Sequence, residues 1–247
     1  MIYTGYTQTD AYFEFTGSEG KLIMPASDVI LVDDESGMLA IKNTASRCTV
    51  GLVKKGSTPP TPPPFQGKWK ATYSGGTTAS ASCDASSAIT SGEITKTDLV
   101  SVELGECVMT IGFAALNNCT SLTSVTIPNS VTSIDDNAFA FSSSLTSIDI
   151  PDSVTSIGHN AFYLCTSLIT VTIGSGITSI NYEAFAFCSA LTAITVKATT
   201  PPTLGGTSPG GYVFGNTNNC PIYVPSGSVE TYKTAWDTYA DRIQPIA

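Results

Sequence analysis

The sequence predicts a mostly β protein, a solenoid of 23-residue repeats with a cap at each end, preceded by a small all-β domain. Apolar residues recur at this constant interval in four successive lines of sequence, which begin at Leu99, Leu122, Leu145 and Leu168. Each line contains a short alternation of apolar and polar residues, which is typical of a β-strand. One such unit cannot bury its own apolar face, whereas stacked units form continuous buried columns.

Each repeat is predicted to contain two short strands and a turn. In the second repeat, Val125 and Ile127 point inward, and Pro128 ends the strand because it cannot donate a hydrogen bond to a sheet. Residues 131–134 form a second extended segment, and residues 135–137 form a turn that caps a helical turn at residues 138–139. We expect the buried columns to include stacked rings of Phe139, Phe162 and Phe185.

The repeat pattern also resembles a known family, the BspA-like leucine-rich repeats, over residues 99–196. The matching segments are LTSVTIPNSVTSIDDNAF, LTSIDIPDSVTSIGHNAFYLC and LITVTIGSGITSINYEAFAFC, which start at Leu122, Leu145 and Leu168. The first repeat departs from the family pattern, with Gly105 in place of Pro and Leu116 in place of Phe, as fits a terminal repeat. The resemblance implies a cell-surface binding or adhesion module that is not an enzyme, and it names no ligand.

Residues 1–55 are predicted to form a small β domain that attaches to a larger body. Several short apolar segments separated by Gly- and Asp-rich turns indicate strands, and a domain of this size has a thin core. Residues 33–35, with sequence DDE, are interpreted as a solvated turn and not as a cation site, because no ligand spacing accompanies them. Residues 56–64, with sequence GSTPPTPPP, are expected to form a semi-rigid polyproline spacer.

Residues 65–98 are predicted to form a hairpin that caps the N-terminal end of the solenoid. Two polar and apolar alternating segments flank Gly75 and Gly76, a pair that favours a tight turn. Trp69 and Tyr73 alternate with lysine here, so a sugar-stacking platform is an alternative to packing within the cap, and we favour packing.

Residues 197–247 are predicted to form the C-terminal cap. After a loop rich in Pro and Gly at 199–211, residues 220–225 form a last strand. One apolar face of a following amphipathic helix is expected to contain Val229, Tyr232, Trp236, Tyr239 and Ile243. Ser228 is expected to cap this helix, and Glu230 lies in its first turn, where a negative charge is favourable. This strand and helix also resemble the C-terminal cap of BspA-like proteins.

The composition excludes several classes of partner. The formal net charge is −9 with only 13% charged residues, whereas nucleic acids and anionic membranes attract basic surfaces. No apolar run approaches the roughly 20 residues of a membrane span. The first residues show no features of a secretory signal peptide. We therefore expect either a virion surface or an extracellular or cell-surface location, and the apparent lack of a leader favours a phage particle.

The seven cysteines show no C-x-x-C pairing pattern. Cys119, Cys165 and Cys188 share one position of the repeat and are predicted to form a ladder of buried thiols. Cys165 and Cys188 lie in adjacent repeats, so a disulfide between them is possible but is not implied by the sequence. The other four have no evident partner in the sequence: Cys48, Cys83, Cys107 and Cys220.

No pattern of catalytic, cofactor-binding or metal-binding residues is found, so the sequence predicts a protein without enzymatic activity or cofactor. The only histidine, His159, lies in a variable turn, and we interpret it as solvated rather than as part of a catalytic triad. Asp135 and Asp136 are neighbours in one loop, whereas paired catalytic carboxylates face each other across a cleft. Metal-ligand spacings are absent from the sequence.

The predicted binding face is a flat polar strip on the parallel sheet of first strands. It consists of outward-facing residues at two positions of the repeat: Ser101, Glu103, Ser124, Thr126, Ser147, Asp149, Thr170, Thr172 and Thr195. Extended faces of this kind are used for binding by repeat proteins. Two alternatives remain open, because the strip offers no aromatic anchor. The strip could serve only to solvate the sheet, or the loop at 199–219 could bind instead.

These observations predict a non-catalytic recognition protein displayed on a larger assembly, with residues 1–55 as the anchor. The favoured version is a phage fibre or decoration protein whose solenoid binds a protein or glycan on a cell surface. One alternative is a secreted or surface-anchored bacterial adhesin, and another is a decoration protein without a ligand. The oligomeric state is left open.

Overall fold

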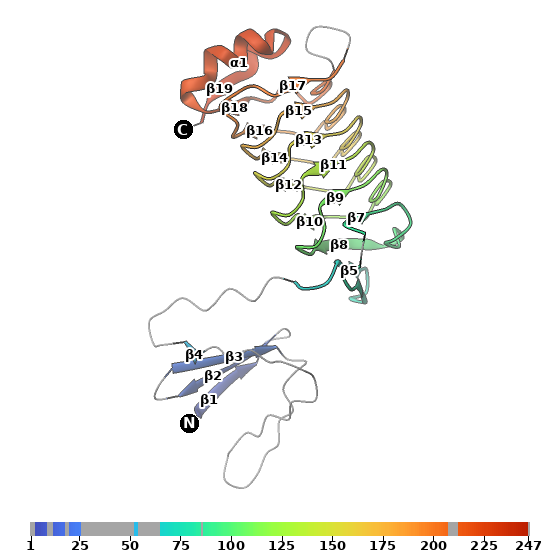
Figure 1. Ribbon diagram of the computed structural model, residues 1–247, viewed down its shortest axis with the longest axis vertical. Helices are drawn as coiled ribbons and strands as arrows, with labels where there is room; N and C mark the ends of the chain where they lie inside the picture. The colour runs from blue at the N-terminus through green and yellow to red at the C-terminus, as the bar shows by residue number, and fades with distance from the viewer. Residues whose placement is uncertain are drawn as a thin grey trace. The chain divides into compact units, whose positions relative to one another are not determined.

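The chain divides into two compact units, Met1–Pro63 and Pro64–Ala247. The computed structural model describes residues 3–8, 12–17, 20–25, 52–53, 65–84, 86–206 and 212–246. The first unit contains one antiparallel sheet, in chain order: β1 (Tyr3–Gln8), β2 (Tyr12–Gly17), β3 (Gly20–Pro25) and β4 (Leu52–Val53) (Figure 1). The acidic turn at 33–35, Cys48 and the proline-rich spacer lie outside the described residues.

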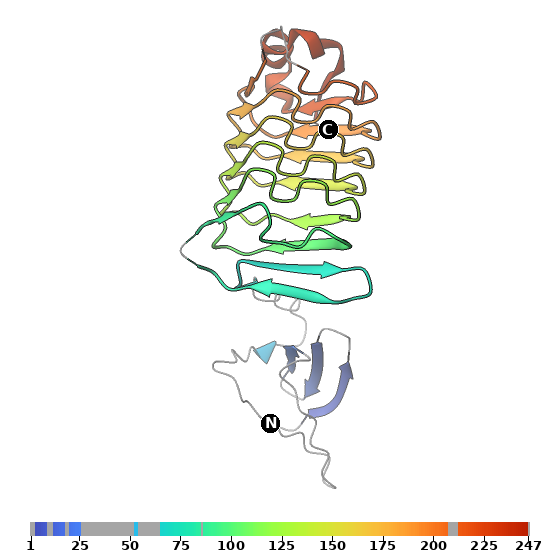
Figure 2. The ribbon, with the colours of Figure 1, turned by 90° about the vertical axis from the view of Figure 1, so that its right-hand side faces the viewer.

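The second unit is a solenoid whose first strands stack in parallel, one per repeat (Figure 2). They are β8 (Leu99–Leu104), β10 (Ser124–Thr126), β12 (Ser147–Ile150), β14 (Thr170–Ile173), β16 (Ala193–Val196) and β18 (Ile222–Val224). Equivalent residues face each other, so that Val171 lies opposite Ile148 and Ile194. This register confirms the predicted β solenoid.

A second parallel sheet runs along the solenoid and contains the second strand of each repeat. Its six strands are β7 (Ala88–Ile89), β9 (Thr110–Ile111), β11 (Ser133–Ile134), β13 (Ser156–Ile157), β15 (Ser179–Ile180) and β17 (Thr203–Leu204). Because β7 precedes Leu99 and β17 follows Val196, the stacked structure extends beyond the predicted limits of the repeats at both ends.

The third side of each repeat is a turn and not the predicted helical turn at 138–139. Its backbone forms a ladder between repeats, in which Phe139 N donates to Ala161 O at 2.7 Å and Phe162 N donates to Ala184 O at 2.7 Å. Residues on this ladder adopt left-handed backbone angles, with φ of 57° at Asn137 and 54° at Asn160. A helix would direct these amides to carbonyls within the same repeat, so pairing between repeats replaces it. We call residues 113–118, 136–141, 159–164 and 182–187 the turn ladder.

The core is one continuous column of apolar side chains. Phe139, Phe162 and Phe185 are fully buried, and adjacent rings stack with centroids 4.9 Å apart and planes within 5° of parallel. Phe214 continues the column at 5.7 Å from Phe185. The predicted ring column is therefore confirmed.

The N-terminal end of the core is covered by an antiparallel hairpin of β5 (Trp69–Tyr73) and β6 (Thr78–Ala81). Strand β5 pairs antiparallel with β8, so the parallel ladder ends there. Beside the hairpin, a disulfide joins Cys83 to Cys107, with 6.1 Å between their Cα atoms. The expectation that neither cysteine has an evident partner was wrong, because Cys83 precedes the repeats, Cys107 shares no repeat position with another cysteine, and the two approach only in the folded chain.

The C-terminal cap is built from shorter elements than predicted. The α-helix α1 covers only Val229–Ala235, between 3₁₀ helices η2 (Ser226–Ser228) and η3 (Asp237–Arg242). Strand β19 (Ile243–Pro245) then pairs in parallel with β18, which satisfies the backbone at that sheet edge. Ser228 makes no side-chain cap to α1, since its hydroxyl donates to Thr199 O at 2.7 Å. The predicted continuous helix was therefore wrong, although the aromatic residues of its face are buried.

Candidate functional site

The structure gathers the residues of the predicted polar strip into two neighbouring groups. Strands β8 and β10 bring Ser101 opposite Ser124 and Glu103 opposite Thr126. Strands β12, β14 and β16 form a separate ladder that carries the remaining members: Ser147, Asp149, Thr170, Thr172 and Thr195. The strip is thus less continuous than expected, because β10 and β12 belong to different sheets.

The polar strip is exposed at its centre and half-buried at its ends. Ser124, Thr126, Ser147, Asp149 and Thr170 are exposed, whereas the other four members are half-buried. Lys70 of β5 lies opposite Glu103 at one end, and Tyr223 of β18 lies opposite Thr195 at the other. The strip can donate and accept hydrogen bonds, but its small hydroxyls bury little apolar area against a partner.

An aromatic patch lies on the turn ladder and on the turn that follows it at Tyr212, where the sequence predicted no exposed anchor. It consists of Phe141, Tyr163, Tyr182, Phe187 and Tyr212. Tyr163 contacts Phe141 and Phe187 edge-on, with centroid distances of 5.7 Å and 5.4 Å. Tyr182 contacts Tyr212 in the same manner at 6.3 Å. The sequence signal for this patch is the second Phe two residues after the buried one, at Phe141 and Phe187.

Glu183 lies beside the aromatic patch. Its hydrogen bond with the Tyr182 hydroxyl raises the pKa of that phenol. The phenol is therefore neutral at physiological pH and can donate a hydrogen bond to Glu183. The aromatic patch and Glu183 together present aromatic rings beside a carboxyl group.

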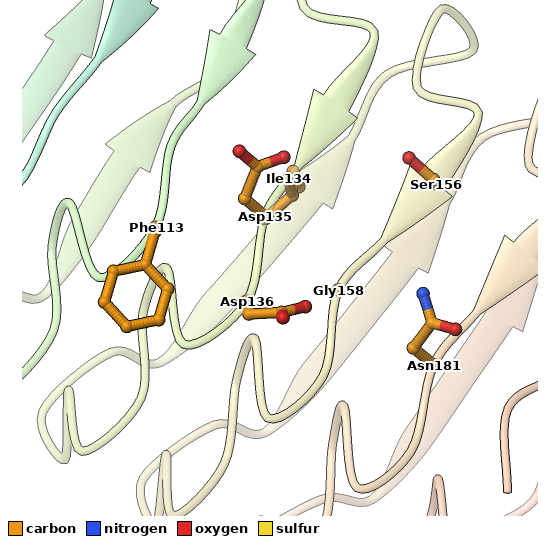
Figure 3. A pocket seen from close by; sticks show the side chains of 7 residues that line it. All are labelled: Phe113, Ile134, Asp135, Asp136, Ser156, Gly158 and Asn181. Atoms are coloured by element: carbon orange, nitrogen blue, oxygen red, sulfur yellow. The ribbon is translucent and has the colours of Figure 1, made fainter.

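A shallow hollow of about 350 Å³ lies between the second sheet and the turn ladder (Figure 3). It is lined by residues of four successive repeats: Phe113, Ile134, Asp135, Asp136, Ser156, Gly158 and Asn181. The carboxylates of Asp135 and Asp136 point in different directions, and Asp136 accepts a hydrogen bond from His159 N at 2.7 Å. Among the residues that the structure describes, no group of three potential metal ligands is found here or elsewhere.

His159 is exposed and takes part in the turn ladder through its backbone. Its backbone N–H is held by Asp136, and its carbonyl accepts from Asn137 N at 2.8 Å. Trp69 is buried in the N-terminal cap, where its Nε1 donates to Glu93 at 3.2 Å, and Tyr73 is half-buried beside it. Trp69 is thus unavailable as a sugar-stacking surface.

The comparison with known families concerns the repeats. Residues 87–202 match the family described as the BspA type leucine rich repeat region, with six copies of the repeat. The solenoid is a BspA-type leucine-rich repeat region. Such regions generally bind proteins or mediate adhesion and are typically found on bacterial surfaces or outside the cell.

Two of the solved structures that match the chain are leucine-rich repeat proteins. The T. pallidum leucine rich repeat protein TpLRR is 23% identical, with a TM-score of 0.49 over 60% of this chain and 76% of that one. A leucine-rich repeat protein from Bacteroides ovatus is 15% identical, with a TM-score of 0.36 over 100% of this chain and 76% of that one. The comparison with curated proteins gave no match.

The three cysteines of the BspA-type repeats, Cys119, Cys165 and Cys188, are buried. Burial raises the pKa of Cys119 to about 11. Hydrogen bonding to Cys165 and burial together raise the pKa of Cys188. Because the thiolate is the nucleophilic form, the raised pKa values of Cys119 and Cys188 favour a packing role for these two thiols. All three are free thiols, and two of them donate to a backbone carbonyl of the preceding repeat: Cys165 to Phe139 O at 3.3 Å and Cys188 to Phe162 O at 3.1 Å.

None of the helices that the structure describes is long and apolar enough to cross a membrane.

Proposed function

We propose that the protein is a non-catalytic recognition protein that acts outside the cell, with the BspA-type repeats as its binding region. The observation that carries the proposal is the regular register of the repeats, which presents exposed side chains in rows across successive strands. Rows of this kind match extended partner surfaces better than they match a small substrate, which requires a concave pocket.

The proposed location outside the cell is supported by a disulfide. The Cys83–Cys107 disulfide lies at the exposed end of the N-terminal cap, and such bonds persist in oxidising surroundings. Both a bacterial surface and a phage virion after release meet this condition. In our proposal residues 1–55 attach the solenoid to that larger body, and fractionation of producing cells into virions, envelopes and medium identifies which body it is.

We propose the polar strip as one contact surface. The test is binding of the fluorescently labelled full chain to intact bacterial cells, for which we expect saturable binding. The variant S124R/T170R places two large cations on the strip and should weaken binding on the order of tenfold. The matched control N129R/T166R adds the same charge at exposed loop positions and should bind as the wild type does.

Two outcomes would contradict these proposals at different levels. If S124R/T170R and the control bind cells equally, the polar strip is not a contact surface, but the proposed recognition function still stands. Binding that never saturates on any bacterial strain tested would instead favour a decoration protein without a ligand.

A further inference from the structure

The aromatic patch on the turn ladder exposes apolar area that the core does not use. The exposed fractions are 44% for Phe141, 39% for Phe187 and 61% for Tyr212. Contiguous exposed apolar patches on a soluble protein commonly mark sites of interaction. Aromatic residues are also enriched among the side chains that dominate binding energy at protein interfaces. This surface therefore supplies the anchors that the polar strip lacks.

The geometry of the rings favours separate contacts over one flat platform. Tyr163 is inclined by 72° to both Phe141 and Phe187, and Tyr182 is inclined by 88° to Tyr212. A sugar chain stacks best on exposed rings that lie in a common plane. Inclined rings instead offer several independent faces, each able to accept one cationic group.

The charge of the surrounding repeats favours a partner of positive charge. Between Lys96 and Lys197 the sequence contains no lysine and no arginine. The same stretch contains eight acidic residues: Asp98, Glu103, Glu106, Asp135, Asp136, Asp149, Asp152 and Glu183. The acidic side chains therefore attract a cationic partner, and no lysine or arginine along this length opposes it. An anionic partner is repelled.

We propose that the aromatic patch, together with Glu183, is a docking site for a lysine- or arginine-bearing segment of a partner protein. The inclined rings receive the cationic side chains through cation–π contacts, and Glu183 pairs with one of them. This inference rests on the proposed recognition function, and it adds a second surface and the chemistry of the partner.

The test is surface plasmon resonance with the immobilised full chain. The probe is a short synthetic peptide of alternating glycine and arginine, and the reference peptide alternates glycine and glutamate. We expect the arginine peptide to bind with an affinity that falls with salt, and the glutamate peptide not to bind. The variant F141S/Y163S/F187S removes three rings without changing charge and should weaken binding on the order of tenfold.

Three further variants make this result specific. F141Y/Y163F/F187Y keeps every ring and should bind as the wild type does. Ile169→Ser changes an exposed apolar residue outside the patch, 46% exposed, and should also leave affinity unchanged. Glu183→Gln should weaken binding severalfold and reduce its salt dependence.

The proposal is overturned if the serine variant binds the arginine peptide as tightly as the wild type does, since general charge attraction would then suffice. Tighter binding of a neutral oligosaccharide such as cellohexaose than of the arginine peptide would also overturn it. Thermal unfolding checks that the triple variant is folded, and Tyr212→Ser provides a single exposed substitution if it is not. Saturable cell binding that survives a negative peptide result would leave the proposed function standing and remove only this site.

Discussion

At the scale of single residues, the buried phenylalanine column dominates stability. Phe162 is stacked between Phe139 and Phe185 and is fully buried, so truncation would leave a cavity in the middle of the core. We expect Phe162→Ala to lower the free energy of unfolding by about 3–5 kcal/mol, measured by urea denaturation. The control Phe141→Ala removes an exposed ring of the same size and should cost much less. Equal losses would show that the column does not carry the core.

Glu93 is the polar centre of the N-terminal cap. Its carboxylate pairs with Lys68 at 2.8 Å and accepts from Trp69 Nε1 at 3.2 Å and from Thr90 N at 3.0 Å. Burial alone would raise the pKa of Glu93, but its hydrogen bonds to Lys68 and Thr90 lower it overall. Burial likewise opposes the charge of Lys68, yet the two carboxylates of Glu93 and Asp84 raise the pKa of that ammonium.

The pH dependence follows from these directions. Because the pKa of Glu93 is lower in the folded state, its stabilisation is present above the ordinary value of 4.5 and is lost as the pH falls through the folded value. Lys68 contributes below its ordinary value of 10.5 and loses that contribution at higher pH. We expect Glu93→Gln to cost roughly 1–3 kcal/mol at neutral pH and to flatten the acid limb of a stability profile. An acid limb as steep as that of Glu230→Gln, an exposed control, would contradict this assignment.

At the scale of elements, the disulfide ties the cap hairpin to the first repeat. Cys83 and Cys107 are 24 residues apart, so the bond restricts the unfolded chain over that loop. We expect C83S/C107S to lower the free energy of unfolding by about 2–4 kcal/mol. Amide hydrogen exchange should accelerate most in β5 and β6, which the bond adjoins. Unchanged exchange in these strands would show that the cap is held by packing alone.

Some elements could be predicted from the sequence and others could not. Strands of the repeats were predicted correctly because alternation and period agree over several copies. The C-terminal helix was overextended because η3 has about three residues per turn, so Tyr239 and Ile243 keep a helix-like spacing although the α-helix ends at Ala235. The disulfide was missed since nothing local relates Cys83 to Cys107, and their proximity exists only once β5 pairs with β8.

Of the two candidate surfaces, one could be predicted from the sequence and the other could not. The outward positions of the polar strip follow from strand alternation alone, whereas the break between β10 and β12 depends on which strands pair in the folded chain. The aromatic patch was missed because a turn has no fixed side-chain period. Phe141 and Phe187 have left-handed backbone angles, with φ of 63° and 61°, and phenylalanine in a sequence does not predict that conformation.

At the scale of the whole molecule, the repeats should behave as interchangeable units. Deleting residues 146–168 removes one complete repeat and joins Leu145 to Ile169, so the next repeat inherits the same register and backbone ladders. We expect this variant to remain folded and to unfold cooperatively, with a lower free energy of unfolding, as measured by circular dichroism in urea. Deleting residues 146–157 removes half a repeat and should abolish cooperative unfolding. Comparable behaviour of the two deletions would contradict a structure built by nearest-neighbour stacking.

The long stretch without lysine or arginine has a consequence for survival in a protease-rich environment. Trypsin and its relatives cleave after these two residues, so they find no susceptible bond between Lys96 and Lys197 even while the chain is transiently open. A nick in the flanking segments would release the central repeats as one covalent piece. The same lack of amines leaves this part of the protein untouched by reagents and crosslinking enzymes that act on lysine.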